Sequence, residues 1–331
     1  MAGKCPAKHC GRPVEEYVLH VAEEEAALRL DQFLARRMPW RSRTFFQGMV
    51  ARGEVVLNQQ QARASTPVRC NDVIIVDISR YQQPYTAPAA IPLDILVEDD
   101  DLLVLNKPPG VVVHPTGIHL YDTLLNAIHA RYHDAAYMPQ VVHRLDKETS
   151  GVLVCVKNEQ ARTRLALEIE GRRVVKLYRA LVHGVPTPLT GEITLPLGGS
   201  RHSHIRLKQD VTPQGGLPAH TLYRVEASAP VVPGLLDGIS LVRAQLMTGR
   251  THQIRVHMAA IGHPVLADKL YGRETRCCIG ALTITSHMLH AWRYTFAHPR
   301  TRVAVTVTAP LPETFAACVR QCFGELDITF D

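Results

Sequence analysis

Asp146 is the side chain whose surroundings best suit it for chemistry. Residues 142–151 read Val-His-Arg-Leu-Asp-Lys-Glu-Thr-Ser-Gly, so this acid lies between Arg144 and Lys147 in a short polar turn before an apolar strand. Nearby cations favour the ionised form of a carboxyl group. We therefore expect Asp146 to act as a base or nucleophile rather than as a proton donor. A surface turn with a local ion pair has the same pattern, so the interpretation depends on the rest of the chain.

A tyrosine and an arginine stand out in two later blocks. Residues 176–184 read Lys-Leu-Tyr-Arg-Ala-Leu-Val-His-Gly and place Tyr178 in an apolar strand, where a core tyrosine is the simplest interpretation. Residues 248–258 read Thr-Gly-Arg-Thr-His-Gln-Ile-Arg-Val-His-Met and place Arg255 in a predicted helix from Thr251 to Ile261. Arg255 falls on the flank of the apolar stripe of that helix, where arginines usually extend along the surface into water.

Short apolar strands dominate the chain beyond residue 93 and often follow one another directly. This order favours an α+β domain with a mixed, mainly antiparallel sheet over a doubly wound parallel sheet. The chain has no Gly-x-Gly-x-x-Gly or phosphate-loop signature, so we expect no nucleotide cofactor. The predicted strands cover residues 102–106, 151–156, 174–182, 219–226, 241–246 and 302–307.

The composition favours a cytoplasmic protein. The 331 residues suffice for two domains with a substantial core. No apolar stretch reaches the length needed to cross a bilayer, and the first residues lack the apolar run of a signal peptide. Eight cysteines without small-domain spacing are expected to be reduced. A monomer is the default expectation.

Two groups of cysteine and histidine raise the question of zinc. Neither has the paired Cys-x-x-Cys spacing of a structural zinc module, so we expect no bound metal. The groups are Cys5, His9 and Cys10 near the N-terminus, and Cys277, Cys278, His287 and His290.

Positive charge is concentrated near the N-terminus. The chain has a net charge of +6, and residues 29–80 contain nine arginines, no lysine and four acidic residues, a local net charge of +5. Clustered cations on a small domain are typical of proteins that bind a phosphate backbone. A solvated basic helix is the alternative. The candidate RNA-binding residues of this segment are Arg36, Arg37, Arg41 and Arg43.

The same segment predicts a compact α/β unit. An amphipathic helix buries Leu30, Phe33 and Leu34 and stops at Pro39. Ser42 is expected to cap a second helix, and two strands follow. The predicted organisation is a flexible tail over residues 1–14, a small α/β RNA-binding domain over 15–80, a proline-containing linker over 81–92 and a catalytic domain over 93–325.

Several motifs in residues 29–74 carry a resemblance to a known RNA-binding module. They are Arg29-Leu-Asp-Gln-Phe-Leu, Arg41-Ser-Arg, Gly53-Glu-Val-Val-Leu-Asn and Asn71-Asp-Val-Ile. Together they resemble the S-four-type module, named for a small-subunit ribosomal protein. Relatives often have glycine after the asparagine of the third motif, whereas Gln59 follows Asn58 here. We therefore expect the hairpin turn to differ locally.

The three chemistry-bearing blocks resemble the RluA-type pseudouridine synthases. The resemblance runs from about Leu93 to Pro312, and further stretches agree with it: Asn106-Lys-Pro-Pro-Gly, Gly262-His-Pro-Val-Leu-Ala-Asp-Lys-Leu-Tyr-Gly and Leu289-His-Ala-Trp-Arg. The resemblance implies a cofactor-free enzyme that isomerises uridines in RNA. Ribosomal RNA of the large subunit is the favoured substrate, and transfer RNA is the alternative.

The resemblance also implies roles for particular residues. Asp146 is the catalytic aspartate, Tyr178 stacks on the target base, and Arg255 pairs with the aspartate. Arg144 fills the space that the extruded uridine leaves or holds a phosphate. Arg250 is a weaker candidate for a phosphate contact. Whether Asp146 acts as a nucleophile or a base stays open.

Two other functions fit parts of the pattern. A non-catalytic RNA-binding or ribosome-assembly factor would use the same fold, although all three catalytic positions are present. A glycosidase that releases uracil commonly needs a second carboxylate, and the sequence places no obvious acid near Asp146 or Tyr178.

Overall fold

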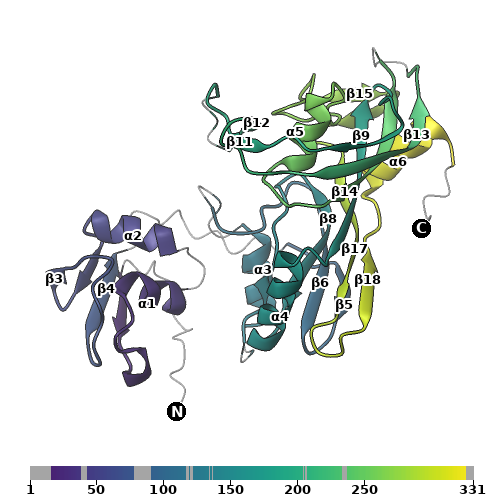
Figure 1. The fold of residues 1–331 in the computed structure, drawn as a ribbon. Helices are drawn as coiled ribbons and strands as arrows, with labels where there is room; N and C mark the ends of the chain where they lie inside the picture. Colours follow the sequence, from purple (N-terminus) through teal and green to yellow (C-terminus); the bar gives the residue numbers. More distant parts are fainter. Residues whose placement is uncertain are drawn as a thin grey trace. The chain divides into compact units, whose positions relative to one another are not determined.

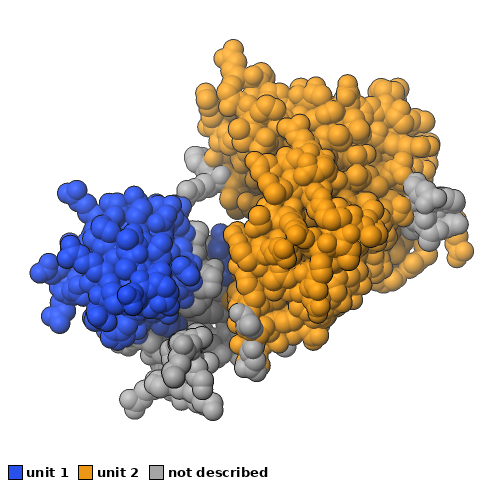
Figure 2. Space-filling view, turned by 60° about the horizontal axis from the view of Figure 1, so that its bottom comes forward, with its two compact units in different colours: residues 1–89, 114–121 blue, residues 90–113, 122–331 orange. Residues whose placement is uncertain are grey.

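The chain folds into two compact units, one of residues 1–89 with 114–121 and the other of residues 90–113 with 122–331 (Figure 2). The computed structural model describes residues 16–38, 43–77, 91–116, 119, 122–133, 135, 137–203, 205, 207–232 and 237–325. The predicted tail and most of the predicted linker lie outside this described part. Across these ranges, every helix is too short or too polar to span a membrane.

The first unit pairs two helices with a small antiparallel sheet (Figure 1). The strand order is β1-β4-β2-β3, and the core gathers Leu30, Phe33, Phe46 and Ile74, none of which is exposed. Pro39 and Ser42, the predicted stop and cap, lie outside the described residues. The elements are β1 (Glu16–His20), a 3-10 turn (Glu23–Glu25), α1 (Leu30–Arg37), α2 (Arg43–Ala51), β2 (Val55–Leu57), β3 (Gln60–Gln61) and β4 (Val73–Asp77).

The turn between β2 and β3 keeps a left-handed backbone without a glycine. Asn58 and Gln59 have φ values of 50° and 65°, the region that a tight two-residue hairpin turn requires. The side chain of Asn58 secures the turn, because its Oδ1 accepts from the backbone N–H of Val73 and its Nδ2 donates to Asp72, both at 2.8 Å. These bonds replace the conformational freedom that glycine would supply.

The second unit is built on a mixed sheet, as predicted. Within the described residues the ten strands have the order β10-β13-β14-β9-β17-β8-β6-β5, with β18 beside β17 and β7 beside β8. All neighbours are antiparallel except β17 and β8, which run parallel. The small hairpins β11–β12 and β15–β16 are separate. Helix α4 packs on β8 and β17, and α6 packs near β13 (Figure 1).

The predicted strands occur with shifted ends, and additional strands complete the sheet. The elements are β5 (Ile95–Glu98), β6 (Leu102–Lys107), α3 (Leu124–Arg131), β7 (Gln140–Val141), β8 (Ser150–Val156), α4 (Glu159–Glu170), β9 (Val175–His183), β10 (Thr190–Ile193), β11 (Leu197–Gly199), β12 (Gln209–Val211), β13 (Thr221–Ala229), β14 (Ile239–Leu246), α5 (Gln253–Ala260), β15 (Cys277–Ile279), β16 (Leu282–Ile284), β17 (Leu289–Ala297), β18 (Ala304–Thr308) and α6 (Glu313–Phe323).

Candidate active site

A cleft of about 580 Å³ opens in the second unit, between the turn before β8, strand β9 and the N-terminal end of α5. This volume is within the range of small-molecule sites, roughly 300 to 1,000 Å³. Its walls include Asp146, Tyr178 and Arg255, together with Arg144 and Arg250. The structure thus brings five sequence-predicted residues, from three separated blocks, to one concave surface.

The turn that carries Asp146 alternates buried and accessible side chains. Leu145 is 7% exposed and anchors the turn in the core, whereas Arg144 is exposed. The side chain of Asp146 retains 18% exposure toward the cleft. The backbone N–H of Thr149 donates to the carbonyl of Asp146 at 3.1 Å, which closes the turn. A carboxylate is therefore held at a fixed place on an otherwise packed wall.

Strand β8 leaves this turn at a point of very close backbone approach. Gly151 has a φ of +108°, and a Cβ at this position would lie 2.1 Å from the carbonyl oxygen of Ala291 on β17. Only glycine fits there. The parallel pairing of Gly151 with Ala291 therefore fixes where the turn meets the sheet.

Two buried histidines fasten the same junction. His287 Nε2 is hydrogen-bonded to Thr149 Oγ1, and His290 Nδ1 to Ser150 Oγ, each at 2.8 Å. Burial lowers the pKa of each histidine to about 4. Both rings are thus neutral near pH 7, and their hydrogen bonds hold Thr149 and Ser150 in place.

Lys107, at the end of β6, stabilises the turn through hydrogen bonds from the core. Its side chain is fully buried, and Nζ donates to the carbonyl oxygens of Pro108, Val111 and Lys147 at 2.8, 2.8 and 2.9 Å. Burial lowers the pKa of Lys107 to about 7. The third bond reaches the residue that follows Asp146, so Lys107 ties the turn to the end of β6.

Arg255 is buried, which corrects the expectation that it extends along the surface. Its guanidinium donates from Nη1 to Oδ2 of Asp146 at 2.9 Å, and from Nε and Nη2 to Asp268 at 2.6 and 2.7 Å. Burial alone would lower the pKa of Arg255, but hydrogen bonds and the charges of the two carboxylates outweigh it and raise the pKa. Two carboxylates together compensate the buried cation.

Helix α5 is also shorter than the prediction of Thr251 to Ile261. It begins after His252, whose left-handed backbone (φ 58°, ψ 18°) is incompatible with a helix that starts earlier. The ring of His252 is held through Nδ1 by Tyr271 Oη at 2.8 Å, and Nε2 lies 3.8 Å from Asp146 Oδ2. Burial lowers the pKa of His252.

Tyr178 lines the cleft while its hydroxyl is engaged within the protein. The side chain is 6% exposed, and its Oη lies 2.6 Å from Oη of Tyr294. Burial raises the pKa of Tyr178 above its ordinary value. The phenol is thus poorly suited to act as a base.

The remaining predicted arginines differ in their contacts. Arg250 donates through Nε to the carbonyl of Pro218 at 3.1 Å. In the first unit Arg36 is exposed, Arg37 is paired with Glu25 at 2.5 Å, and Arg43 is paired with Asp31 at 2.9 Å. Arg41 lies outside the described residues. Arg37 and Arg43 hold internal acids, a role that the charge count did not reveal.

The predicted cysteine and histidine groups do not gather around a common centre where the structure describes them. His287 and His290 bind hydroxyl groups, as above, and Cys277 is buried while Cys278 is exposed. The other group, Cys5, His9 and Cys10, lies outside the described residues.

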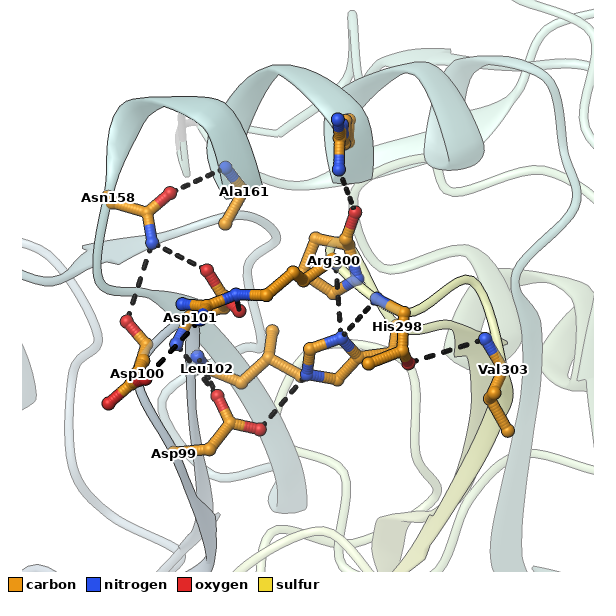
Figure 3. Close-up of polar contacts among 12 residues, drawn as sticks. Asp99, Asp100, Asp101, Leu102, Asn158, Ala161, His298, Arg300 and Val303 are labelled. Carbon is orange, nitrogen blue, oxygen red and sulfur yellow. Dashed lines mark hydrogen bonds and ion pairs between the residues drawn. The ribbon is translucent and has the colours of Figure 1, made fainter.

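Three other residues, Asp99, Asp101 and His298, form the one described group with ligand atoms close enough for a metal ion. Figure 3 shows that the side chains of these residues already have hydrogen-bond partners within the protein. Asp101 accepts from Arg300 Nε at 2.6 Å and from Asn158 Nδ2 at 2.7 Å, and Asp99 contacts His298 at 3.0 Å. The network joins the β5–β6 turn to the β17–β18 turn and to the start of α4, which is a structural role.

Sequence reasoning missed residues that support the site and residues that line the cleft. Lys107 and Asp268 support it, and the available signal was a charged residue in each of the quoted blocks, Asn106-Lys-Pro-Pro-Gly and Gly262-to-Gly272. Glu170 and Lys176 line the cleft. Glu170 is a second carboxylate in the wall, which the sequence did not place there.

Comparison with known proteins identifies relatives over nearly the whole chain. Residues 101–260 match the profile described as RNA pseudouridylate synthase, and residues 28–74 match that of the S4 domain. An uncharacterized RNA pseudouridine synthase of Chloroflexus aurantiacus is 41% identical over 93% of this chain and 94% of its own. Ribosomal large subunit pseudouridine synthase D of Nitrosomonas europaea is 36% identical over 91% of this chain and 86% of its own.

A solved structure agrees with these relatives. Human RNA pseudouridylate synthase domain containing 1 superposes with a TM-score of 0.56 at 29% identity, covering 72% of this chain and 90% of that one.

Proposed function

Because the chain belongs to the RNA pseudouridylate synthase family, we propose that it isomerises specific uridines of large-subunit ribosomal RNA, with Asp146 as the catalytic carboxylate and no cofactor. The observation that carries the proposal is the position of Asp146. One of its oxygens accepts from buried Arg255 at 2.9 Å, and its side chain faces a cleft that Tyr178 also lines.

The reaction conserves every atom of the nucleoside. The bond from C1′ of the ribose to N1 of uracil breaks, the base turns, and C1′ joins C5. C5 then loses its proton and N1 gains one, so the product is an isomer of the substrate. An ionised carboxylate can attack the sugar or the base, or remove a sugar proton. Arg255 supports the charged form of Asp146 through a charge-assisted hydrogen bond.

Tyr178 offers the detached base a place to remain. Base stacking on an aromatic ring is worth roughly 1 to 3 kcal/mol. Since the hydroxyl of Tyr178 is bonded to Tyr294, we assign it stacking rather than proton transfer. Arg144 is exposed at the cleft and suits the space left by a flipped uridine, whose extrusion costs a few kcal/mol.

Two features support an RNA target. The S4 domain match indicates an RNA-binding N-terminal unit, whose exposed arginines include Arg36, Arg63 and Arg69. The relative from Nitrosomonas europaea is named for the large ribosomal subunit. We therefore propose ribosomal RNA as substrate for a monomeric enzyme that works in the cytoplasm.

Mapping pseudouridines by carbodiimide adducts in total RNA tests this proposal. Strains with and without the gene, and a deletion strain complemented with it, are compared. We expect one or more large-subunit positions to lose their adducts on deletion and to regain them on complementation. An unchanged ribosomal pattern would contradict the proposed target, and losses confined to transfer RNA would support the alternative substrate. Release of free uracil from RNA by the purified enzyme would instead indicate a glycosidase.

A further inference from the structure

Asp268 is a buried carboxylate to which the reaction described so far gives no part. It accepts from Nε and Nη2 of Arg255 at 2.6 and 2.7 Å, and its own side chain is fully buried. The third nitrogen of the same guanidinium, Nη1, donates to Asp146 at 2.9 Å. One arginine is therefore shared by two carboxylates, with its two-pronged side on Asp268 and a single donor on Asp146.

The backbone fixes Asp268, so Arg255 must align with it. Oδ1 of Asp268 also accepts from the N–H groups of Leu270 and Tyr271 at 2.9 and 3.2 Å. Just before it, the N–H of Leu266 donates to the carbonyl of Leu181 on β9 at 2.9 Å. The carboxylate is thereby set in place by the main chain on both sides.

The tyrosine in this segment also guides the guanidinium. The ring of Tyr271 lies 5.1 Å from the guanidinium carbon of Arg255, within the range of a cation–π contact. Hydrogen bonds and the charge of Arg255 outweigh burial and lower the pKa of Asp268, so this acid is ionised. The residues Asp268 and Tyr271 together define the plane and direction of the arginine.

Because Arg255 is shared, Asp146 receives less charge compensation and fewer hydrogen bonds from it. Two carboxylates and one guanidinium carry a net charge of −1, so Asp146 is not fully neutralised by its partner. Without Asp268, the two-pronged side of Arg255 would be available to take both oxygens of Asp146. In the described part of the chain Asp146 instead receives one hydrogen bond from Arg255, on Oδ2.

We propose that Asp268 is a positioning residue for the isomerisation. By occupying the two-pronged side of Arg255, it limits Asp146 to one hydrogen bond and leaves the other carboxylate oxygen available to the uridine. This inference rests on the proposed catalytic role of Asp146.

Steady-state kinetics of the full-length enzyme on its RNA substrate test the inference. Asp268→Asn removes the charge with little change of shape, and Asp268→Glu keeps the charge but displaces it. Asp101→Asn is the matched control, because Asp101 is also buried and accepts from an arginine Nε at 2.6 Å, yet its partner Arg300 does not line the cleft, whereas Arg255 does. The fraction of folded protein is measured for each variant, and kcat is expressed per folded enzyme.

For Asp268→Asn we expect kcat to fall about 100-fold, since small misplacements of reacting groups cost this much, while KM changes little. Asp268→Glu should lose less activity. Asp101→Asn should lower the melting temperature without changing kcat or KM.

A merely structural Asp268 would give different results. A kcat of Asp268→Asn within about threefold of wild type would overturn the inference. If Asp268→Asn does not fold, Asp268→Glu decides: reduced kcat at unchanged KM supports the inference, and wild-type kcat overturns it. A wild-type enzyme that forms no pseudouridine would overturn the proposed function and this inference together.

Discussion

Each unit of the molecule contains arginine–aspartate ion pairs in which one partner is buried. The buried partner is the aspartate in the N-terminal unit and the arginine in the catalytic unit. In the N-terminal unit Asp31 is fully buried, and its partners Arg29 and Arg43 are 43% and 45% exposed. In the catalytic unit the arginine is buried, with Arg255 5% exposed, and Asp146 keeps 18% exposure toward the cleft. The contrast separates a structural acid from an accessible one.

The buried partner of each pair is held in place by the protein core. The accessible partner can also contact a ligand. Asp31 holds α1 and α2 together while its arginines reach the surface, where RNA phosphates bind cations. Arg255 is held by Asp268 and presents Asp146 to the cleft. The same two residue types thus present a cation in one unit and a carboxylate in the other.

Removing the buried arginine should have the largest effect. In Arg255→Met, Asp268 loses its counter-ion inside the protein, which typically costs about 3 to 5 kcal/mol of unfolding free energy. Asp146 loses its hydrogen-bond donor at the same time, so pseudouridine formation should fall at least about 1,000-fold. Urea unfolding and single-turnover assays at saturating enzyme measure the two effects. Activity within tenfold of wild type would contradict the assigned role of Arg255.

The mirror substitution, Asp31→Asn, should weaken the N-terminal unit and spare the chemistry. The exposed arginines can return to water, so the loss is that of the charge-assisted hydrogen bonds, about 1 to 3 kcal/mol. Hydrogen exchange of the α1 amides in the full-length protein should accelerate, and exchange in β8 and α5 should not. The single-turnover rate at saturating RNA should stay within about twofold of wild type. A large loss of that rate would contradict the assignment of a structural role to Asp31 and a catalytic role to Asp146.

Acid should weaken the catalytic unit before the N-terminal unit. His287 and His290 are buried, and burial lowers the pKa of each to about 4, so the unfolded chain binds their protons first as pH falls below about 6.5. The free energy of unfolding should therefore decrease between pH 6.5 and 4, by about 1.4 kcal/mol per pH unit for each histidine.

His290→Gln tests this pH dependence, since glutamine does not titrate. Below about pH 6.5 the free energy of unfolding of the variant should depend less steeply on pH, by the contribution of one histidine. This expectation holds whatever the stability of the variant at pH 7. His20→Gln in the exposed part of β1 is the matched control and should keep the full slope. An unchanged slope in His290→Gln would show that another group is responsible.

Much of the fold was predictable because its signals are local. The helix with Leu30, Phe33 and Leu34 on one face and the apolar run at residues 151–156 depend only on neighbouring residues. Strand β17 was not predicted, since His290 within it becomes acceptable in the core only through its bond to Ser150, 140 residues earlier in the chain.

The candidate site shows the same limit. Asp146 was a candidate because of its cationic neighbours, and the roles of Tyr178 and Arg255 came from the resemblance. The burial of Arg255 depends on Asp268, on a different segment. Lys107 is likewise explained by the carbonyl of Lys147, which is 40 positions away along the chain. Helical periodicity placed Arg255 on the flank of an apolar stripe, whereas α5 is buried from Gln253 to Met258, and it could not show that two carboxylates would bind the arginine there.

The most direct test of the account is pseudouridine formation by Asp146→Asn in a single turnover on the mapped RNA substrate, with RNA affinity and melting temperature measured on the same protein. We expect no detectable product, unchanged affinity within about threefold and a preserved fold, because asparagine keeps the shape but not the charge of the side chain. Substantial product from the folded variant would contradict the claim that the Asp146 carboxylate performs the isomerisation.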